Sequence, residues 1–182
     1  AACTAAAASP GQPPAADCNL DLQAAVAVIR AHEPDIVGLQ EVDRSWARSG
    51  YVDQPEALSA ALGMTHRCYA PNLSHPPDTH ADRPHQYGTL ILSRHPIASC
   101  GNTLLPRTVA TNEQRGFTLA AIDVQGVTLR FYNTHLHTSA ADRLLQTTAI
   151  AQAIDSAAPD PTVVVGDFSA RPTAGEMTPI AD

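Results

Sequence analysis

The spacing of apolar residues along this chain predicts three helices separated by strands. The first helix begins after Asp21, a favourable N-cap, and ends before Pro34, because apolar residues recur between them on one helical face. A second helix is predicted over residues 55–62, where Gly63 provides a typical C-terminal stop. A third helix fits residues 140–157, in which apolar residues again return every three or four positions.

Short apolar runs between these helices predict strands. They are residues 35–40, 87–92, 97–103, 116–124, 127–133 and 162–165. The dipeptide Gln125-Gly126 lies between two of them like a hairpin turn, and residues 71–85, rich in Pro and His, predict a polar loop. Because helices and hairpins both occur, the pattern favours a layered mixed α/β architecture over a purely doubly wound sheet.

The first 19 residues show neither the apolar spacing of a helix nor the apolar runs of a strand. They are rich in Ala, Pro, Ser and Gly, which predicts a disordered leader over residues 1–19 and a single domain over residues 20–182. The start Ala1-Ala2-Cys3 is similar to the end of a lipoprotein cleavage site, with Cys3 as the lipidated residue. This favours a secreted or cell-envelope location after signal removal, with an ordinary terminus and a cytoplasmic location as the alternative.

Composition and charge exclude several classes of function. All 11 basic residues are Arg, so a Walker-A phosphate loop and a Lys Schiff base are excluded. The formal net charge of -7 argues against a strong nucleic-acid footprint, since binding to the phosphate backbone needs a basic stripe. No apolar run approaches the roughly 20 residues of a transmembrane segment. The four cysteines permit disulfides without defining them, because they show no CxxC pair.

Three polar clusters directly follow predicted strands, at the ends where sheet proteins usually build their sites. Gln40-Glu41 follows the run IVGL, and the Glu41 carboxylate can bind a hard cation such as Mg²⁺, with a solvated loop acid as the alternative. In GDFS, after the run VVV, Asp167 can orient an attacking water and Ser169 can donate to an oxyanion.

The remaining cluster, NTHLH, contains two histidines. Residues two apart in a strand share a face, so Asn133, His135 and His137 are expected to point together. His135 can then donate to a phosphate oxygen or transfer a proton near neutral pH. A zinc-binding HxH pair, or one packed and one exposed His, is the alternative. The three histidines of the loop 71–85 are irregularly spaced and interrupted by Pro, which predicts solvated side chains and no metal cluster.

Taken together and in this order, the segments LQEVD, YGTLILSRHPI, NTHLH and GDFSARP resemble the endonuclease/exonuclease/phosphatase superfamily of metal-dependent phosphoesterases. The resemblance implies an α+β, DNase-I-like sandwich of two mixed β-sheets flanked by helices. It implies that Glu41 is the metal ligand and that His135 contacts and polarises the scissile phosphate. Asp167 matches the Asp that orients the attacking water or binds a leaving-side metal. The implied cofactor is Mg²⁺, with Mn²⁺ as an alternative.

The sequence also departs from the family pattern. Asn19 lies too close to the first helix to replace the family's metal-binding Asn, and Ser169 stands where the family has an Asn that meets phosphate. The family's later Asp-His pair, whose His is the general base, has no match before Asp182. A C-terminal truncation with an incomplete second sheet is therefore expected. Tyr87 and Arg94 lie within the strand motif and are expected to support the fold.

The resulting hypothesis is a Mg²⁺-dependent phosphoesterase that hydrolyses a phosphodiester or phosphomonoester by metal-assisted attack of water. Its catalytic residues would be His135, Asp167 and Ser169, and its metal ligand Glu41. A catalytically inactive or fragmentary relative that acts as a binding module is the alternative. The expected partner is a phosphate-ester substrate, and the acidic charge favours a small or lipid phosphoester over duplex DNA. The oligomeric state is left open.

Overall fold

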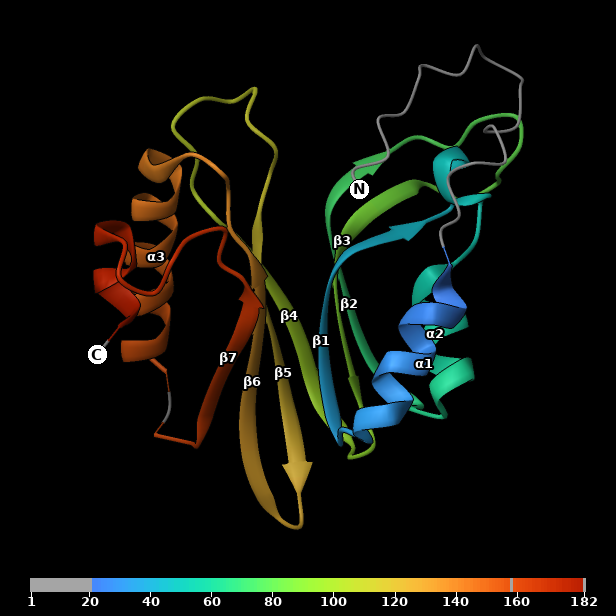
Figure 1. The fold of residues 1–182 in the computed structure, drawn as a ribbon, viewed down its shortest axis with the longest axis horizontal. Helices are drawn as coiled ribbons and strands as arrows, with labels where there is room; N and C mark the ends of the chain where they lie inside the picture. Colours follow the sequence, from blue (N-terminus) through green and yellow to red (C-terminus); the bar gives the residue numbers. More distant parts are fainter. Residues whose placement is uncertain (1–20, 158, 182) are drawn as a thin grey trace.

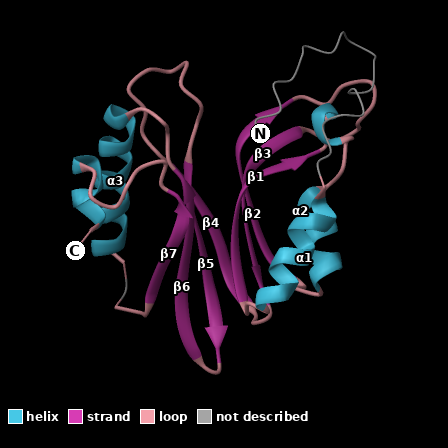
Figure 2. Cartoon of the chain, in the orientation of Figure 1, coloured by secondary structure: helices cyan, strands magenta, loops and turns pink. Residues whose placement is uncertain are grey.

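Two β-sheets lie face to face at the centre of the molecule, and helices cover their outer surfaces (Figures 1 and 2). This computed structural model describes residues 21–157 and 159–181, so the predicted leader at residues 1–19 lies outside the described residues. The predicted sandwich of two sheets with flanking helices is confirmed. No described helix has the length and apolar character that a membrane span would need.

The first sheet is antiparallel throughout and has the strand order β1-β3-β2. Its elements, with the helices on its outer face, are α1 (Leu22–His32), β1 (Ile36–Arg44), the short 3₁₀ helix η1 (Ala47–Ser49), α2 (Gln54–Leu62), β2 (His66–His75) and β3 (His85–Ser93). The helix α1 begins directly after Asp21, as the sequence predicts, and α2 begins one residue before its predicted start. Asp21 and Asp53 accept hydrogen bonds from backbone N–H groups in the first turns of these helices.

The second sheet has the order β4-β5-β6-β7 and is mixed, because β6 and β7 run parallel. Its elements are β4 (Ile97–Leu104), β5 (Gly116–Val124), β6 (Val127–His135), α3 (Ala140–Asp155), β7 (Thr162–Asp167) and η2 (Gly175–Ile180). The helix α3 connects β6 to β7 and packs on the outer face of this sheet together with η2 (Figure 1). The parallel pair therefore brings the ends of β6 and β7 to the same edge of the molecule.

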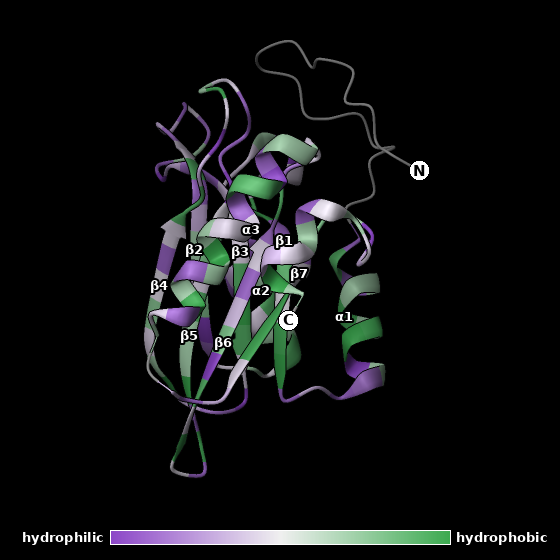
Figure 3. Cartoon of the chain, turned by 90° about the vertical axis from the view of Figure 1, so that its left-hand side faces the viewer, coloured by the Kyte–Doolittle hydropathy of each residue, from purple (hydrophilic) through white to green (hydrophobic). Residues whose placement is uncertain are grey.

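Three apolar clusters hold these layers together, and Figure 3 shows apolar positions on the strands and on the helices that cover them. Val26 of α1 and Leu58 of α2 pack against Leu90 and Leu92 of the first sheet. A central cluster fills the space between the two sheets and consists of Cys68, Ile91, Ala120, Ile122 and Phe131. Each sheet is covered on one face by the other sheet and on its outer face by helices. Apolar and polar residues therefore alternate only weakly along its strands.

The sequence-based prediction of a polar loop with solvated histidines over residues 71–85 is wrong at both ends. At its end, His85 begins β3, is buried and contacts the Ser45 carbonyl oxygen through Nδ1. Residues 66–75 form the strand β2, which pairs with β3 as far as His75 opposite His85. The strand escaped prediction because it contains Pro71 and few apolar residues. Its place at the sheet edge explains the tolerance for Pro, since an edge strand does not need every N–H for pairing.

A disulfide and a buried asparagine are among the contacts that join the sheets. Cys68 of β2 and Cys100 of β4 form a disulfide with their Cα atoms 5.5 Å apart, which links one edge strand of each sheet. Asn133 of β6 is fully buried and donates from Nδ2 to the carbonyl oxygens of Leu39 (2.9 Å) and Leu90 (3.1 Å) in the first sheet. Its side chain therefore fixes how closely the two sheets approach beneath the candidate site.

Candidate active site

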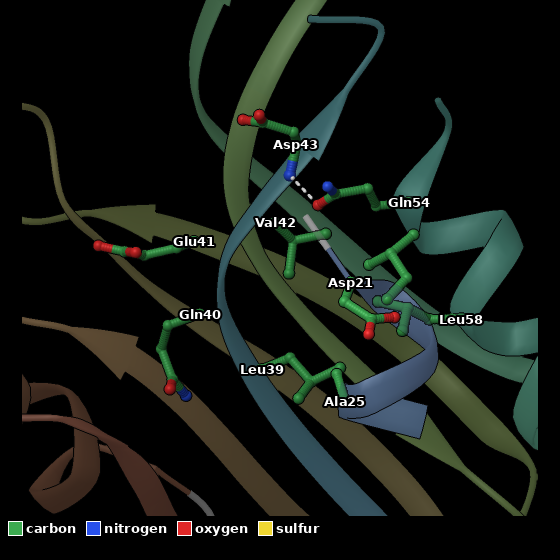
Figure 4. Close-up of a pocket in the computed structure, with 10 residues that line it drawn as sticks. Asp21, Ala25, Leu39, Gln40, Glu41, Val42, Asp43, Gln54 and Leu58 are labelled. Carbon is green, nitrogen blue, oxygen red and sulfur yellow. Dashed lines mark hydrogen bonds between the residues drawn. The ribbon is translucent and has the colours of Figure 1, made fainter. Parts of the chain in front are cut away.

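The first candidate residue, Glu41, lies in a β-bulge of β1. The register of β1 against β3 shifts between Leu39 and Val42, so Gln40 and Glu41 fall outside the regular pairing. Glu41 adopts a positive φ of 58°, a conformation that is uncommon for a residue with a side chain. Figure 4 shows that the side chains of Gln40 and Glu41 point away from Leu39 and Val42, which line a pocket beside α1. The bulge thus turns an exposed carboxylate toward the second sheet.

His135 ends β6 and lies opposite Asp167 in the parallel register with β7. The imidazole is almost fully buried, and its Nε2 atom lies 3.7 Å from Oδ2 of Asp167. Burial lowers the pKa of His135, and the Arg115 guanidinium lowers it further, whereas Asp167 and Glu41 act in the opposite direction. The ring is therefore neutral at neutral pH. Gln40, the neighbour of Glu41, donates from Nε2 to Oδ1 of Asn133, two residues before His135 on β6.

Asp167 and Ser169 share a tight turn after β7. Gly166 has a φ of 156°, and a Cβ atom there would come within 2.2 Å of the Thr134 carbonyl oxygen, so only Gly lets β7 approach β6 this closely. Oδ1 of Asp167 accepts hydrogen bonds from the Ser169 backbone N–H (2.7 Å) and from its hydroxyl (3.2 Å). The hydroxyl of Ser169 thus orients Asp167, and its donation to a phosphate oxygen stays a prediction.

Asn133 and His137, the other two residues of NTHLH expected to point with His135, make different contacts. Asn133 is the buried tie between the sheets, and its Oδ1 accepts from Nε2 of Gln40 at 2.7 Å. His137 lies beyond the end of β6, where its Nδ1 accepts from the Ser139 N–H at 3.0 Å and lies 3.3 Å from Oδ2 of Asp142. Asn133 and His135 lie two residues apart on β6 and so share a face, but the expectation is wrong for His137, because the strand ends at His135.

One residue in contact with His135 was not singled out by the sequence. Arg115, just before β5, is buried and its Nη1 lies 3.1 Å from Nδ1 of His135. Burial raises the pKa of Tyr87 on β3 to about 12, and the carboxylates of Glu113 and Glu41 contribute while Arg115 opposes them. Tyr87 is therefore part of this electrostatic cluster. Arg94, in contrast, donates to the Pro34 carbonyl oxygen as a fold contact.

The sequence contains a feature from which the contact between Arg115 and His135 can be predicted. The predicted hairpin turn at Gln125-Gly126 fixes the register of β5 against β6, starting with Val124 opposite Val127. Followed along the hairpin, this register places His135 opposite Gly116, directly beside Arg115. The pairing was missed because the predicted strand stopped at residue 133, two residues short of His135.

The carboxylates of Glu41 and Asp167 are ligands that suit a loosely held magnesium ion. Mg²⁺ prefers oxygen ligands, keeps several waters and is commonly bound by one or two carboxylates together with substrate phosphate. Glu41 is exposed and the side chain of Asp167 is 56% exposed, so both carboxylates are accessible. Within residues 21–157 and 159–181, no three His, Cys, Asp or Glu side chains gather as a metal cage.

Comparison with known proteins identifies relatives of this fold. The sequence profile described as Endonuclease/Exonuclease/phosphatase family matches residues 7–182. No curated protein matches the sequence. Among solved structures, sphingomyelinase C from Streptomyces griseocarneus is 20% identical with a TM-score of 0.63, over 86% of this chain and 60% of that one.

Two further structures show the same fold. A mannosyl-6-phosphatase from Bacteroides thetaiotaomicron is 16% identical with a TM-score of 0.62, over 86% of this chain and 59% of that one. A double mutant of beta toxin from Staphylococcus aureus, with bound magnesium ions, is 14% identical with a TM-score of 0.60, over 80% of this chain and 56% of that one. The chain thus spans 56–60% of the length of these structures.

Proposed function

The chain belongs to the endonuclease/exonuclease/phosphatase family, and from this premise we propose that it is a magnesium-dependent phosphoesterase. One observation carries the proposal. Glu41, His135 and Asp167 come from three different strands, yet the fold brings their charges within range of one another at one end of the sandwich. A neutral imidazole flanked by two carboxylates suits the transfer of a phosphoryl group to water.

The surroundings of His135, Asp167 and Glu41 give each residue a different catalytic role. The buried, neutral His135 donates a hydrogen bond from Nε2 to a phosphate oxygen and stabilises the charge that develops there. Asp167, held by Ser169, orients the attacking water on the open side of the ring. Glu41 would hold Mg²⁺, or Mn²⁺ in its place, and the bound ion supplies positive charge to the phosphate oxygens.

A small or lipid phosphoester is the substrate class we favour. The formal net charge is -7 and the chain contains no Lys, so a long nucleic-acid backbone would be repelled. Related folds include a sphingomyelinase and a phosphatase, whose names describe a lipid and a sugar phosphoester as substrates. A structure of beta toxin holds magnesium ions, which supports the choice of metal.

An oxidising location, such as the cell envelope or the extracellular space, is part of the same proposal. The Cys68–Cys100 disulfide supports it, because disulfides persist mainly outside the reducing cytosol. The start Ala1-Ala2-Cys3, which favours a lipoprotein, lies outside the described residues.

Hydrolysis of two simple esters tests the proposal. The chain is incubated with bis(p-nitrophenyl) phosphate, a diester, and p-nitrophenyl phosphate, a monoester, with Mg²⁺ or with EDTA. We expect turnover with Mg²⁺ and a loss of about 100- to 1,000-fold in kcat/KM for Glu41→Gln, because the variant keeps the size of the side chain but loses the charge that holds the ion. Calorimetry should show Mg²⁺ binding to the wild type and weaker binding to this variant.

Glu33→Gln provides a matched control. Glu33 is also an exposed glutamate with a positive φ, at the C-cap of α1 and outside the site. Its variant should keep both activity and Mg²⁺ binding. Equal activity of Glu41→Gln and wild type would exclude Glu41 as the metal ligand, and no turnover of either ester would leave the binding-module alternative.

A further inference from the structure

Arg115 is the least expected residue of the site. Its side chain is only 9% exposed, and its Nη1 atom contacts both Glu113 Oε1 (2.5 Å) and His135 Nδ1 (3.1 Å). Its Nε atom is buried and has no hydrogen-bond partner among the described residues. Burying a charged group with an unpaired N–H is unfavourable for stability. Arg115 is therefore placed for something other than the stability of the fold.

The contact between Arg115 and His135 determines where the imidazole carries its proton. A guanidinium can only donate hydrogen bonds, so the Nδ1 atom of His135 must accept. In a neutral imidazole the proton then lies on Nε2. This is the nitrogen that faces Asp167 and the open side of the site.

We propose that Arg115 is a positioning residue that locks His135 in the Nε2–H tautomer. The arrangement is the reverse of a catalytic triad, in which a carboxylate accepts from Nδ1–H and leaves Nε2 free to act as a base. With a donor at Nδ1, the neutral ring instead presents an N–H at Nε2. His135 can then donate to a phosphate oxygen but cannot accept the proton of water at that nitrogen. The proposal deepens the proposed function, on which its catalytic consequence rests.

The charges around the pair support this assignment. Glu113 balances the Arg115 charge from the loop before β5, Asp167 of β7 lies 3.7 Å from Nε2 of the ring, and the Glu41 carboxylate acts on the ring electrostatically from β1. The backbone of Arg115 is also held, because its carbonyl oxygen accepts from the Leu105 N–H at 2.9 Å. Arg115 is thus fixed in position before any substrate binds.

Nuclear magnetic resonance tests the tautomer without substrate or metal. In ¹⁵N-labelled protein, long-range ¹H–¹⁵N correlations of the His135 ring at neutral pH should show the proton on Nε2 alone. In Arg115→Met the donor is lost, and we expect a mixture of both tautomers. In Arg115→Lys an N–H donor remains, and the Nε2–H form should be largely restored. The exposed Arg94 is the control, and Arg94→Met should leave the His135 signals unchanged.

Kinetics provides the second readout. We expect kcat to fall about 10- to 100-fold in Arg115→Met with a smaller change in KM, and Arg115→Lys to recover part of kcat. A proton on Nδ1 in the wild type, or an unchanged tautomer in a folded Arg115→Met, would overturn the proposal. If Arg115→Met fails to fold, an Arg115→Lys variant with the proton on Nδ1 overturns it as well. A wild type that holds the Nε2–H form but hydrolyses neither ester would disprove the proposed function alone.

Discussion

The two sheets contribute different halves of the candidate site, one exposed to solvent and one buried. The first sheet supplies Glu41 from an exposed bulge with a positive φ. The second sheet supplies His135, which is 6% exposed and contacts Arg115 and Asp167. One half is therefore rigid before anything binds, whereas the other presents an accessible carboxylate to solvent. Under the proposed function, the His135 half would pre-organise the hydrogen-bond donors, and the Glu41 half would stay open for the proposed ion and substrate.

The rigid half depends on a network behind the sheet. Asp142 at the start of α3 is fully buried and accepts hydrogen bonds from the Thr108 N–H (2.5 Å) and from Nδ2 of Asn112 (2.6 Å). It thereby ties the loop between β4 and β5, which carries Arg115, to the helix. His137 lies on the same network, 3.3 Å from Asp142. Two histidines only two residues apart thus serve different purposes.

Replacing each histidine separately gives the largest expected contrast. His135→Ala removes the Nε2 donor, so we expect kcat to fall by about 1,000-fold or more, within the range for lost donors and proton-transfer groups. His137→Ala should instead lower the melting temperature, because it disturbs the Asp142 network, and change kcat much less. Ester hydrolysis and thermal unfolding of both variants measure the contrast. Equal losses of kcat in the two variants would show that the NTHLH segment acts as one unit.

Removing the disulfide tests whether the two halves need a covalent link. The Cys68–Cys100 bridge closes a loop with a sequence separation of 32 residues, which corresponds to about 3–4 kcal/mol of stability in the chain-entropy description. Cys100→Ser should lower the free energy of unfolding by about this amount. Reduction of the wild type with dithiothreitol should have a similar effect and leave the variant unchanged.

Activity below the unfolding temperature sharpens this test. Asn133 joins the sheets beneath the site without the bridge, through the carbonyl oxygens of Leu39 and Leu90. We therefore expect folded Cys100→Ser to keep kcat within about 3-fold of wild type. A much larger loss of activity in the folded variant would show that the bridge, and not Asn133, aligns the halves.

The sequence predicted the positions of the site residues better than their contacts. The sequence singles out Glu41, His135 and Asp167 because each follows an apolar run, and the structure places His135 and Asp167 opposite each other at the ends of β6 and β7. The bulge at Glu41 was not foreseen, since nothing in LQEVD indicates a shift of register. Arg115 was missed because its role arises from a contact across 20 residues that only the hairpin register reveals.

A pH titration of stability gives the smallest expected effect and tests the network behind the rigid half. The hydrogen bond from the Thr108 N–H, together with the nearby His137 and Asn112, lowers the pKa of Asp142 below its usual 3.8. Because the folded pKa is lower than the unfolded one, the contribution to stability is present above pH 4 and is lost as the pH falls through the folded value. Asp142→Asn should therefore melt about 3–6 °C below wild type at pH 7.

The difference between Asp142→Asn and wild type should shrink below pH 4, because the wild type then loses the same charge. Asp123→Asn is the control, since Asp123 is an exposed carboxylate that accepts from the Gly126 N–H in a hairpin turn away from the site. A melting difference for Asp142→Asn that stays constant from pH 7 to pH 3 would show that the geometry of the side chain, and not its charge, holds the loop. The geometry of the Asp142 side chain would then anchor the loop that carries Arg115, and the His135 half of the site would keep its stability in acid.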